Sequence, residues 1–230
     1  MKRFTQGEVE VDAGVFFPTE TTKLILDSVA SIRFDGLDLL DLGCGCGIVA
    51  AVLGRTSDTR QLFASDLSAA ATANARRNLD RLGVSAQVRT GSLYEPWADT
   101  RFDVVICDVS GVAEDLARVS GWFGDSVPCA AGRDGAALGL QIIKDTPRQL
   151  QPGGRLFMPV LTLSNHRRLV DELAAQFARV TPIAERQFYL PKELMTQAAL
   201  IDELQQEGAI EIEKKFGLYL WKTIVYQANL

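Results

Sequence analysis

The chain has 230 residues, of which 47% are hydrophobic and 23% charged, and its formal net charge is −5. This composition is typical of a globular protein, and the length favours a single domain, residues 1–230, around one sizeable core. The acidic balance argues against a protein that grips nucleic acid mainly through its phosphates. No apolar run approaches the roughly 20 residues that cross a bilayer, and the N-terminus lacks the apolar stretch of a signal peptide. We therefore expect a cytoplasmic protein with no membrane partner.

Short apolar segments alternate with helical ones through most of the chain. Residues 68–83 have the signature of a helix, with Ser68 as the N-cap and Gly83 just beyond the end. Segments typical of strands are residues 37–43, 61–66, 86–91, 102–108 and 153–161. Continuous apolar strands joined by helices predict an α/β fold, with a mostly parallel sheet covered by helices on both faces. In such sheets a ligand binds beyond the carboxyl ends of the strands.

Two further helices are expected in the second half of the chain. Pro147 should bend or break a helix within residues 133–154, because its ring clashes with the carbonyl group four residues earlier. The later helix should bury one face, formed by Leu169, Leu173 and Phe177.

The C-terminal region changes character. Residues 181–193 and 216–227 resemble two strands without the helical crossover that a parallel pair needs, so we expect an antiparallel pair. Between them, residues 191–209 predict an additional helix with one apolar stripe, formed by Leu194, Ala198, Ile201 and Leu204. This helix could pack on the core, form a lid over the substrate, or make an oligomer contact such as that of a homodimer. The sequence does not determine the oligomeric state.

The segment LDLLDLGCGCGIVAAVL, residues 37–53, predicts a sharp turn from a strand into a helix. Gly43, Gly45 and Gly47 let the backbone adopt positive φ and approach a ligand closely. Ile48 occupies the place of the last glycine in a dinucleotide-binding fingerprint, and the Lys-Ser/Thr pair of a phosphate-binding loop is absent. Asp41 beside the loop would repel a pyrophosphate, so it favours a cationic ligand.

The number and spacing of the cysteines, together with the single histidine, do not indicate a metal site. The four cysteines form no C-x-x-C pair, and one histidine is too few for a histidine-based cluster. The cysteines are Cys44, Cys46, Cys107 and Cys129.

Asp66 ends the second predicted strand, 19 residues after Gly47. A carboxylate at that place can accept hydrogen bonds from both hydroxyl groups of a ribose, each worth roughly 1.5–3 kcal/mol. The alternative is an aspartate that only caps the following helix. Ser68 already provides a suitable cap.

The motifs LLDLGCGCGIVA and ASDLS together resemble the S-adenosylmethionine site of class I methyltransferases. The resemblance implies a Rossmann-like fold with a seven-stranded sheet. It also implies that S-adenosyl-L-methionine is the cofactor and S-adenosyl-L-homocysteine the product. In that family the glycine loop wraps the amino-acid part of the cofactor, and the acid of the second strand holds the ribose. The residues implied are Asp41, Gly43, Cys44, Gly45, Gly47, Asp66 and Leu67.

Residues 14–160 resemble, more narrowly, the HemK/PrmC-like glutamine methyltransferases. GVFFPTETTKLILDSV is similar to that family's N-terminal segment, and GSLYEPW and GRDGAALGLQIIKDTPRQLQPGGRLFMPV are similar to its later motifs. Further cofactor contacts are thus implied for Phe17, Pro18, Thr22, Ser92 and Leu93. The chain divides accordingly into an N-terminal segment and helix, a cofactor-binding core and a C-terminal substrate half, which are residues 1–36, 37–160 and 161–230.

The chain departs from that family in two places. Only about a dozen residues precede the matching region, where the family has a helical domain that recognises release factors. The family's acceptor motif N-P-P-Y is replaced by Asp108-Val109-Ser110-Gly111. Ionised Asp108, also a candidate cofactor contact, could orient an acceptor group or act as a general base, or only cap the next helix. Ser110 could hold the acceptor or serve as a cap.

These departures make glutamine methylation doubtful and leave three functional hypotheses. The first is a methyltransferase that transfers a methyl group to an oxygen or nitrogen of a small metabolite or biosynthetic intermediate. The second is a methyltransferase with a protein or RNA acceptor. The third is a non-catalytic protein that binds S-adenosylmethionine.

Overall fold

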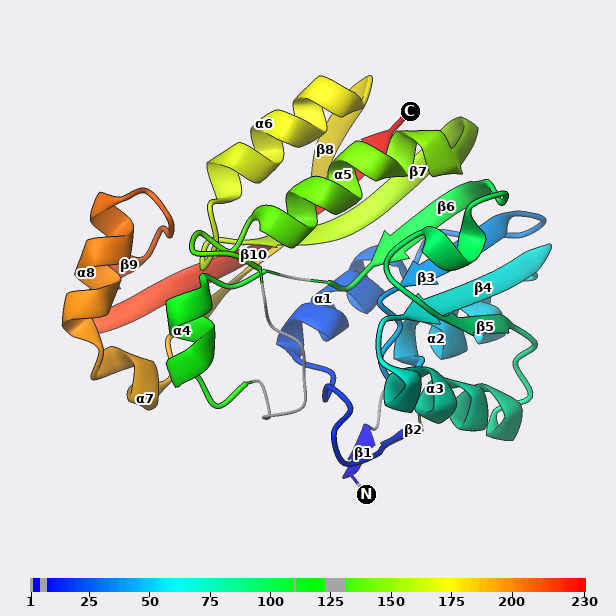
Figure 1. Ribbon diagram of the computed structural model, residues 1–230, viewed down its shortest axis with the longest axis horizontal. Helices are drawn as coiled ribbons and strands as arrows, with labels where there is room; N and C mark the ends of the chain where they lie inside the picture. Colours follow the sequence, from blue (N-terminus) through cyan, green and yellow to red (C-terminus); the bar gives the residue numbers. More distant parts are fainter. Residues whose placement is uncertain (1, 5–7, 110, 123–130) are drawn as a thin grey trace.

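The computed structural model of the protein describes residues 2–4, 8–109, 111–122 and 131–230 (Figure 1). Its main sheet has eight strands in the order β5-β4-β3-β6-β7-β10-β8, with β9 paired to β10. The strands are β1 Lys2–Phe4, β2 Val9–Val11, β3 Asp38–Leu42, β4 Gln61–Asp66, β5 Gln87–Thr90, β6 Phe102–Cys107, β7 Leu150–Leu161, β8 Arg179–Tyr189, β9 Glu213–Lys215 and β10 Leu218–Asn229.

Strands β3 to β7 pair in parallel, and β10 runs antiparallel to β7, β8 and β9. The mostly parallel sheet with an antiparallel C-terminal pair is thereby confirmed. The helices are α1 Glu20–Val29, α2 Ile48–Thr56, α3 Ala69–Arg81, η1 Glu95–Trp97, α4 Glu114–Val119, α5 Ala137–Gln149, α6 His166–Gln176, α7 Lys192–Met195 and α8 Ala198–Gln206. No helix in these described ranges is long and apolar enough to cross a membrane.

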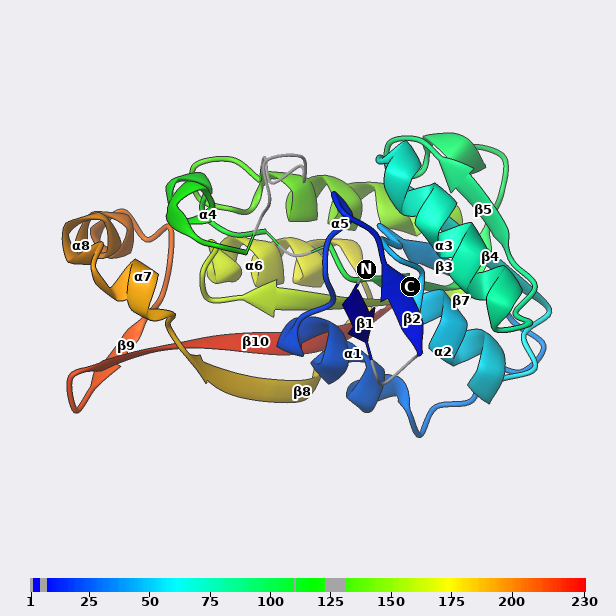
Figure 2. The ribbon, with the colours of Figure 1, turned by 90° about the horizontal axis from the view of Figure 1, so that it is seen from below.

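The sheet separates two apolar cores because successive side chains of a strand point to opposite faces. Leu39 belongs to the core under α1, α2 and α3, whereas Leu40, the next residue of β3, belongs to the core under α5 and α6. Figure 2 shows the two groups of helices on either side of the sheet. The expected buried face of α6 is confirmed, since Leu169, Leu173 and Phe177 are each at most 5% exposed.

A third apolar cluster lies at the end of the sheet where β10 and β8 extend beyond the other strands (Figure 1). Here α4 packs against the α7–α8 region, and Leu116, Leu194, Ile201 and Leu204 are fully buried. We call this region, α4 together with residues 190–212, the C-terminal lobe. It is built from the segment that follows β6 and from the segment that separates the two antiparallel strands.

Two expectations need correction, and one element was not expected. Helix α5 is not broken at Pro147 and ends only at Gln149; the proline forfeits the bond to the Ile143 carbonyl, but only two helical residues follow it. The single helix expected in residues 191–209 is two short helices separated by Thr196 and Gln197. This break turns Ala198 to solvent, so it does not share the buried stripe of α7 and α8. The β1–β2 ribbon was not anticipated.

Candidate active site

A cavity of about 250 Å³ opens beyond the carboxyl ends of β3, β4 and β6. This is the edge at which parallel α/β sheets bind ligands. Of the residues singled out in the sequence, the structure brings Pro18, Thr22, Asp41, Gly43, Cys44, Gly45, Asp66, Leu67, Ser92, Leu93 and Asp108 into its wall. It does not bring Phe17 or Gly47 there, and Ser110 lies outside the described residues.

The three glycines of the loop after β3 all have positive φ, between 52° and 80°, but their structural roles differ. A Cβ atom on Gly43 would lie 2.1 Å from the Val109 side chain, and one on Gly47 would lie 3.0 Å from Ala75 of α3. These two glycines therefore allow close packing. Gly45 lines the cavity, and a Cβ atom there would meet nothing within 4 Å. Its missing side chain keeps space for a ligand.

Replacing Gly45 with alanine should weaken cofactor binding more than it destabilises the fold. The left-handed backbone costs an alanine about 1–2 kcal/mol, while the added methyl group fills ligand space. We expect at least a tenfold rise in Kd, measured by calorimetry, with a modest loss of thermal stability. Alanine at Gly36, which has φ +71° and also meets nothing within 4 Å, is the matched control because Gly36 lies outside the cavity wall. Equal affinity losses in both variants would contradict the assignment.

Asp66 binds the glycine loop directly. Its Oδ2 accepts a hydrogen bond from the Gly45 N–H at 2.9 Å, and its Oδ1 accepts one from the Ser68 N–H at 2.8 Å. Ser68, and not Asp66, is the N-cap of α3. Because a carboxylate oxygen can accept more than one bond, both oxygens retain capacity for a ligand in the cavity. The aspartate thus holds the loop in shape and remains available for hydroxyl groups.

Asp41 is fully buried at the cavity. Its Oδ2 accepts the Ala50 N–H at 3.0 Å, while its Oδ1 is buried without a hydrogen-bond partner among the described residues. Burial raises the pKa of Asp41 to about 8, and the negative charges of Asp108 and Asp66 add to the rise, against the lowering effect of the Ala50 bond. A cation in the cavity would give the Asp41 Oδ1 a partner, and it would offset the repulsion between Asp41 and the charges of Asp108 and Asp66.

Asp108 follows the end of β6 and faces the N-terminal end of α1. Its Oδ2 accepts a hydrogen bond of 2.6 Å from the Thr22 hydroxyl, which itself accepts the Thr19 N–H at 3.1 Å. Because the Thr22 oxygen accepts the Thr19 N–H, the Thr22 hydroxyl is free to donate its proton to Asp108. Burial raises the pKa of Asp108 to about 7, although the Thr22 bond lowers it. Helix α4 begins six residues later with Ala113 as its N-cap, so Asp108 does not cap that helix.

The segment after Asp108 has no room for an aromatic side chain at Gly111. A Cβ atom on Gly111 would lie 1.8 Å from the carbonyl oxygen of Gly135, in the loop before α5. One on Gly135 would in turn lie 2.6 Å from the backbone nitrogen of Ala113. The two backbones touch, and this contact explains in physical terms why the tyrosine of N-P-P-Y has no counterpart here.

Sequence reasoning missed part of the cavity wall, which also includes Gly14, Val15, Phe16, Val109, Leu138 and Gln141. Phe16 lines the cavity in place of its neighbour Phe17. Only tertiary structure distinguishes two adjacent phenylalanines, because a loop has no regular period that assigns one of them to the inside.

The donor set fits S-adenosylmethionine. The open glycine at Gly45 admits a ligand close to the backbone, the unpaired oxygen of Asp41 suits a cationic group, and Asp66 suits hydroxyl groups. The chain has the fold of the class I S-adenosylmethionine-dependent methyltransferases, and its site is similar to theirs. Within that class, residues 7–108 match the family model of the methyltransferase small domain.

Relatives of known name are methyltransferases. A release factor glutamine methyltransferase of Geobacter sulfurreducens is 30% identical over 152 residues, 64% of this chain and 54% of that protein. A ribosomal RNA small subunit methyltransferase C of Photorhabdus laumondii is 29% identical over 146 residues, 60% of this chain and 38% of that protein. The chain spans about half the length, or less, of these curated relatives. The similarity to the HemK-like enzymes is thereby confirmed.

Solved structures share the fold. The E. cuniculi Mtq2–Trm112 complex, responsible for methylation of the eRF1 translation termination factor, has a TM-score of 0.60 at 13% identity, over 94% of this chain and 98% of that one. The T. thermophilus 16S rRNA N2 G1207 methyltransferase, in complex with AdoMet and guanosine, has a TM-score of 0.55 at 15% identity, over 96% of this chain and 43% of that one.

The relatives overturn the expectation of a small-molecule substrate. They are named for the methylation of a release factor, a ribosomal protein or ribosomal RNA, which are all macromolecules. The loss of N-P-P-Y does not indicate a small acceptor. That loss removes one way of holding a planar amide, and it says little about the size of the molecule that carries the acceptor.

Proposed function

We propose that the protein transfers the methyl group of S-adenosylmethionine to a nitrogen or oxygen atom of a protein acceptor. The observation that carries this proposal is the position of Asp108, a carboxylate oriented by Thr22 in the wall of the cavity that fits the cofactor. The names of the relatives support a macromolecular acceptor. The net charge of −5 favours protein over RNA, because phosphate recognition usually brings a basic surplus.

The chain's own residues would act mainly by positioning. The cofactor supplies a methyl group that is already activated on its sulfonium, so orientation of the acceptor can provide much of the rate enhancement. Gly45 and Asp66 would hold the cofactor, and Asp41 would balance its positive charge. Asp108 would accept a hydrogen bond from the acceptor N–H or O–H and receive its proton. With a pKa of about 7, Asp108 suits proton transfer near neutral pH.

The test is transfer of a labelled methyl group from the cofactor into acid-precipitable material of a cell extract. We expect label in the precipitate that protease releases and ribonuclease does not. Release by ribonuclease alone would favour an RNA acceptor and contradict the proposal. Cofactor binding without any transfer would instead favour the non-catalytic alternative. The Asp108→Ala variant, loaded with cofactor, provides the background for each arm.

A further inference from the structure

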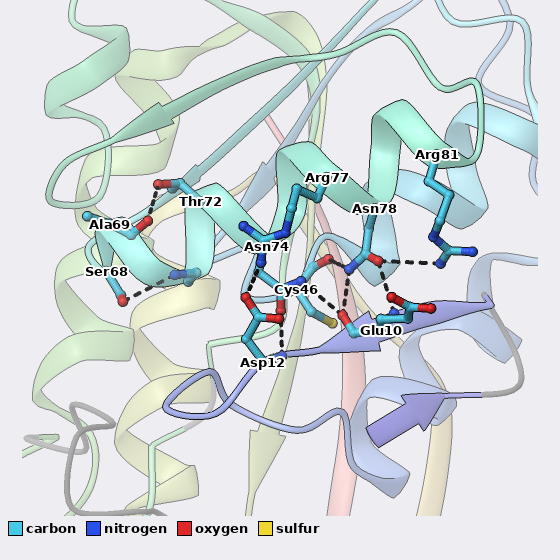
Figure 3. Close-up of polar contacts among 11 residues, drawn as sticks. Glu10, Asp12, Cys46, Ser68, Ala69, Thr72, Asn74, Arg77, Asn78 and Arg81 are labelled. Atoms are coloured by element: carbon cyan, nitrogen blue, oxygen red, sulfur yellow. Dashed lines mark hydrogen bonds and ion pairs between the residues drawn. The ribbon is translucent and has the colours of Figure 1, made fainter. Parts of the chain in front are cut away.

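Two buried asparagines of α3, Asn74 and Asn78, hold the N-terminal segment at Glu10 and Asp12 (Figure 3). Asn74 and Asn78 are 1% and 2% exposed, although the surrounding sequence NARRNLDR reads as the solvated face of a helix. They are four residues apart and therefore lie on the same face, about 6 Å apart along the axis. The next-but-one residues of a strand repeat at about 6.7 Å. The two amides can thus pair with Glu10 of β2 and with Asp12, the residue that follows this strand.

The hydrogen bonds of the two asparagines agree with this match between the helix spacing and the strand spacing. The Asn78 Oδ1 accepts the Glu10 N–H at 2.9 Å, and its Nδ2 donates to the Glu10 carbonyl at 2.8 Å. The Asn74 Oδ1 accepts the Asp12 N–H at 3.0 Å, and its Nδ2 also donates to the Glu10 carbonyl, at 2.9 Å. Strand β2 pairs with β1 along its other edge. The helix therefore supplies the edge of β2 with the partners that a neighbouring strand would otherwise provide.

Asn78 reaches a second element. Its Nδ2 also donates to the carbonyl of Cys46 at 2.8 Å, in the glycine loop of the cavity. One amide therefore ties the glycine loop to β2. Asn74 holds only the N-terminal segment, through Glu10 of β2 and Asp12 just after it.

The segment that these asparagines hold leads directly into the cavity. Val9 and Val11 are buried in the core beneath it, and Gly14, Val15, Phe16 and Pro18 line the cavity wall. We define residues 9–18 as the N-terminal strap. The strap then enters α1, whose Thr22 binds Asp108. The position of the strap therefore affects both the wall of the cavity and the orientation of Asp108, the proposed base.

We propose that Asn78, assisted by Asn74, is a positioning residue that fixes the N-terminal strap and the glycine loop in one arrangement and thereby sets cofactor affinity. The inference rests on the proposed function only in taking S-adenosylmethionine as the ligand. Neither asparagine lines the cavity, so their effect is indirect. Leucine, of similar size but apolar, removes the amide at each position.

The experiment compares Asn78→Leu, Asn74→Leu and Arg76→Gln for binding of S-adenosylmethionine by calorimetry. Each variant is also examined by hydrogen exchange without cofactor. Arg76 is the matched control, since it is an exposed residue of the same helix and donates a hydrogen bond to the Val88 carbonyl of β5, outside the N-terminal strap. We expect Asn78→Leu to raise Kd about tenfold or more and Asn74→Leu a few-fold, because buried partners are left unsatisfied. Arg76→Gln should change Kd less than about twofold.

Hydrogen exchange separates positioning from global stability. We expect the Glu10 amide to lose protection in Asn78→Leu and the Asp12 amide to lose protection in Asn74→Leu, because each loses its side-chain acceptor, while the amides of the central strands stay protected. A folded variant that loses this protection but keeps the wild-type Kd would overturn the proposal. Should Asn78→Leu not fold, Asn74→Leu decides by the same criterion. If S-adenosylmethionine were not the ligand, the result would differ visibly, because the wild-type protein itself would not bind it; if only methyl transfer failed, the comparison of Kd values would still stand.

Discussion

The Asp108→Asn variant is expected to transfer methyl groups at least about 100-fold more slowly than the wild-type protein, because the loss of a positioned base typically costs 10²–10⁴-fold. Asparagine keeps an oxygen that can accept the Thr22 hydroxyl, now 2.6 Å from Asp108, so the local structure should persist. It cannot take the acceptor's proton. The measurement is the initial rate of label incorporation into precipitable protein at saturating cofactor.

The Thr22→Val variant is the companion to this experiment. Thr22 lowers the pKa of Asp108, so its removal should raise that pKa above 7 and reduce the ionised fraction at neutral pH. The rate should fall at pH 7 and recover toward the wild-type value as the pH rises. The Asp108→Asn variant should show no such recovery. A rate for Asp108→Asn within a few-fold of wild type would mean that Asp108 only shapes the cavity.

The Asp41→Asn variant is expected to weaken cofactor binding by roughly 10- to 100-fold, the equivalent of losing a charge-assisted hydrogen bond. The same change should stabilise the unliganded protein at alkaline pH. The folded-state pKa of Asp41, about 8, lies well above its value of about 3.9 in an unfolded chain. A raised pKa means that the stability contributed by this group is complete below pH 4 and is lost as the pH rises toward 8.

The free energy of unfolding of the unliganded wild-type protein should therefore fall between about pH 4 and pH 8, and the Asp41→Asn variant should lose less over this range. Denaturant titrations at pH 5.5, 7 and 8.5 measure the difference. Asp108, with a pKa of about 7, contributes in the same direction in both proteins, so it does not obscure the comparison. Identical pH dependence in the two proteins would show that Asp41 is ionised in the unliganded fold at neutral pH.

Calorimetry provides an independent test of the same pKa. A cationic ligand favours the ionised carboxylate, so cofactor binding at pH 7 should release protons from Asp41. The number released follows from the heats measured in buffers of different ionisation enthalpy. We expect fewer protons to be released by the Asp41→Asn variant. A wild-type protein that binds the cofactor without proton release would contradict the raised pKa.

Two long-range contacts lie on the segment that follows Asp108. Gly111 and Gly135 are in backbone contact there, and the C-terminal lobe packs on the segment that follows Asp108. Neither contact could be inferred from spacing, because the residues concerned lie on loops and short helices far apart in the chain. The sequence signalled only that the family's acceptor motif had been replaced.

The glycine loop and its place in the cavity wall could be predicted from the sequence because they depend on local geometry. A strand, a glycine turn and a helix are contiguous, so Asp41, Gly43 and Gly45 are placed by the chain itself. Asp66 follows from the same logic, since adjacent parallel strands end at the same edge. The class of fold and the cofactor were therefore determined by short-range patterns and the order of the strands.

Other parts of the site were decided by tertiary structure alone. The side chains of Asn74 and Asn78 belong to a helix that looks solvated in sequence, because an asparagine does not reveal whether its partner is water or a distant strand. The hydrogen bond between Thr22 and Asp108 joins residues 86 positions apart. The raised pKa of Asp108 depends on its burial, which is a property of the packed molecule. The sequence by itself determined the cofactor and its loop, and long-range packing decided how the strap, the proposed base and the C-terminal lobe surround it.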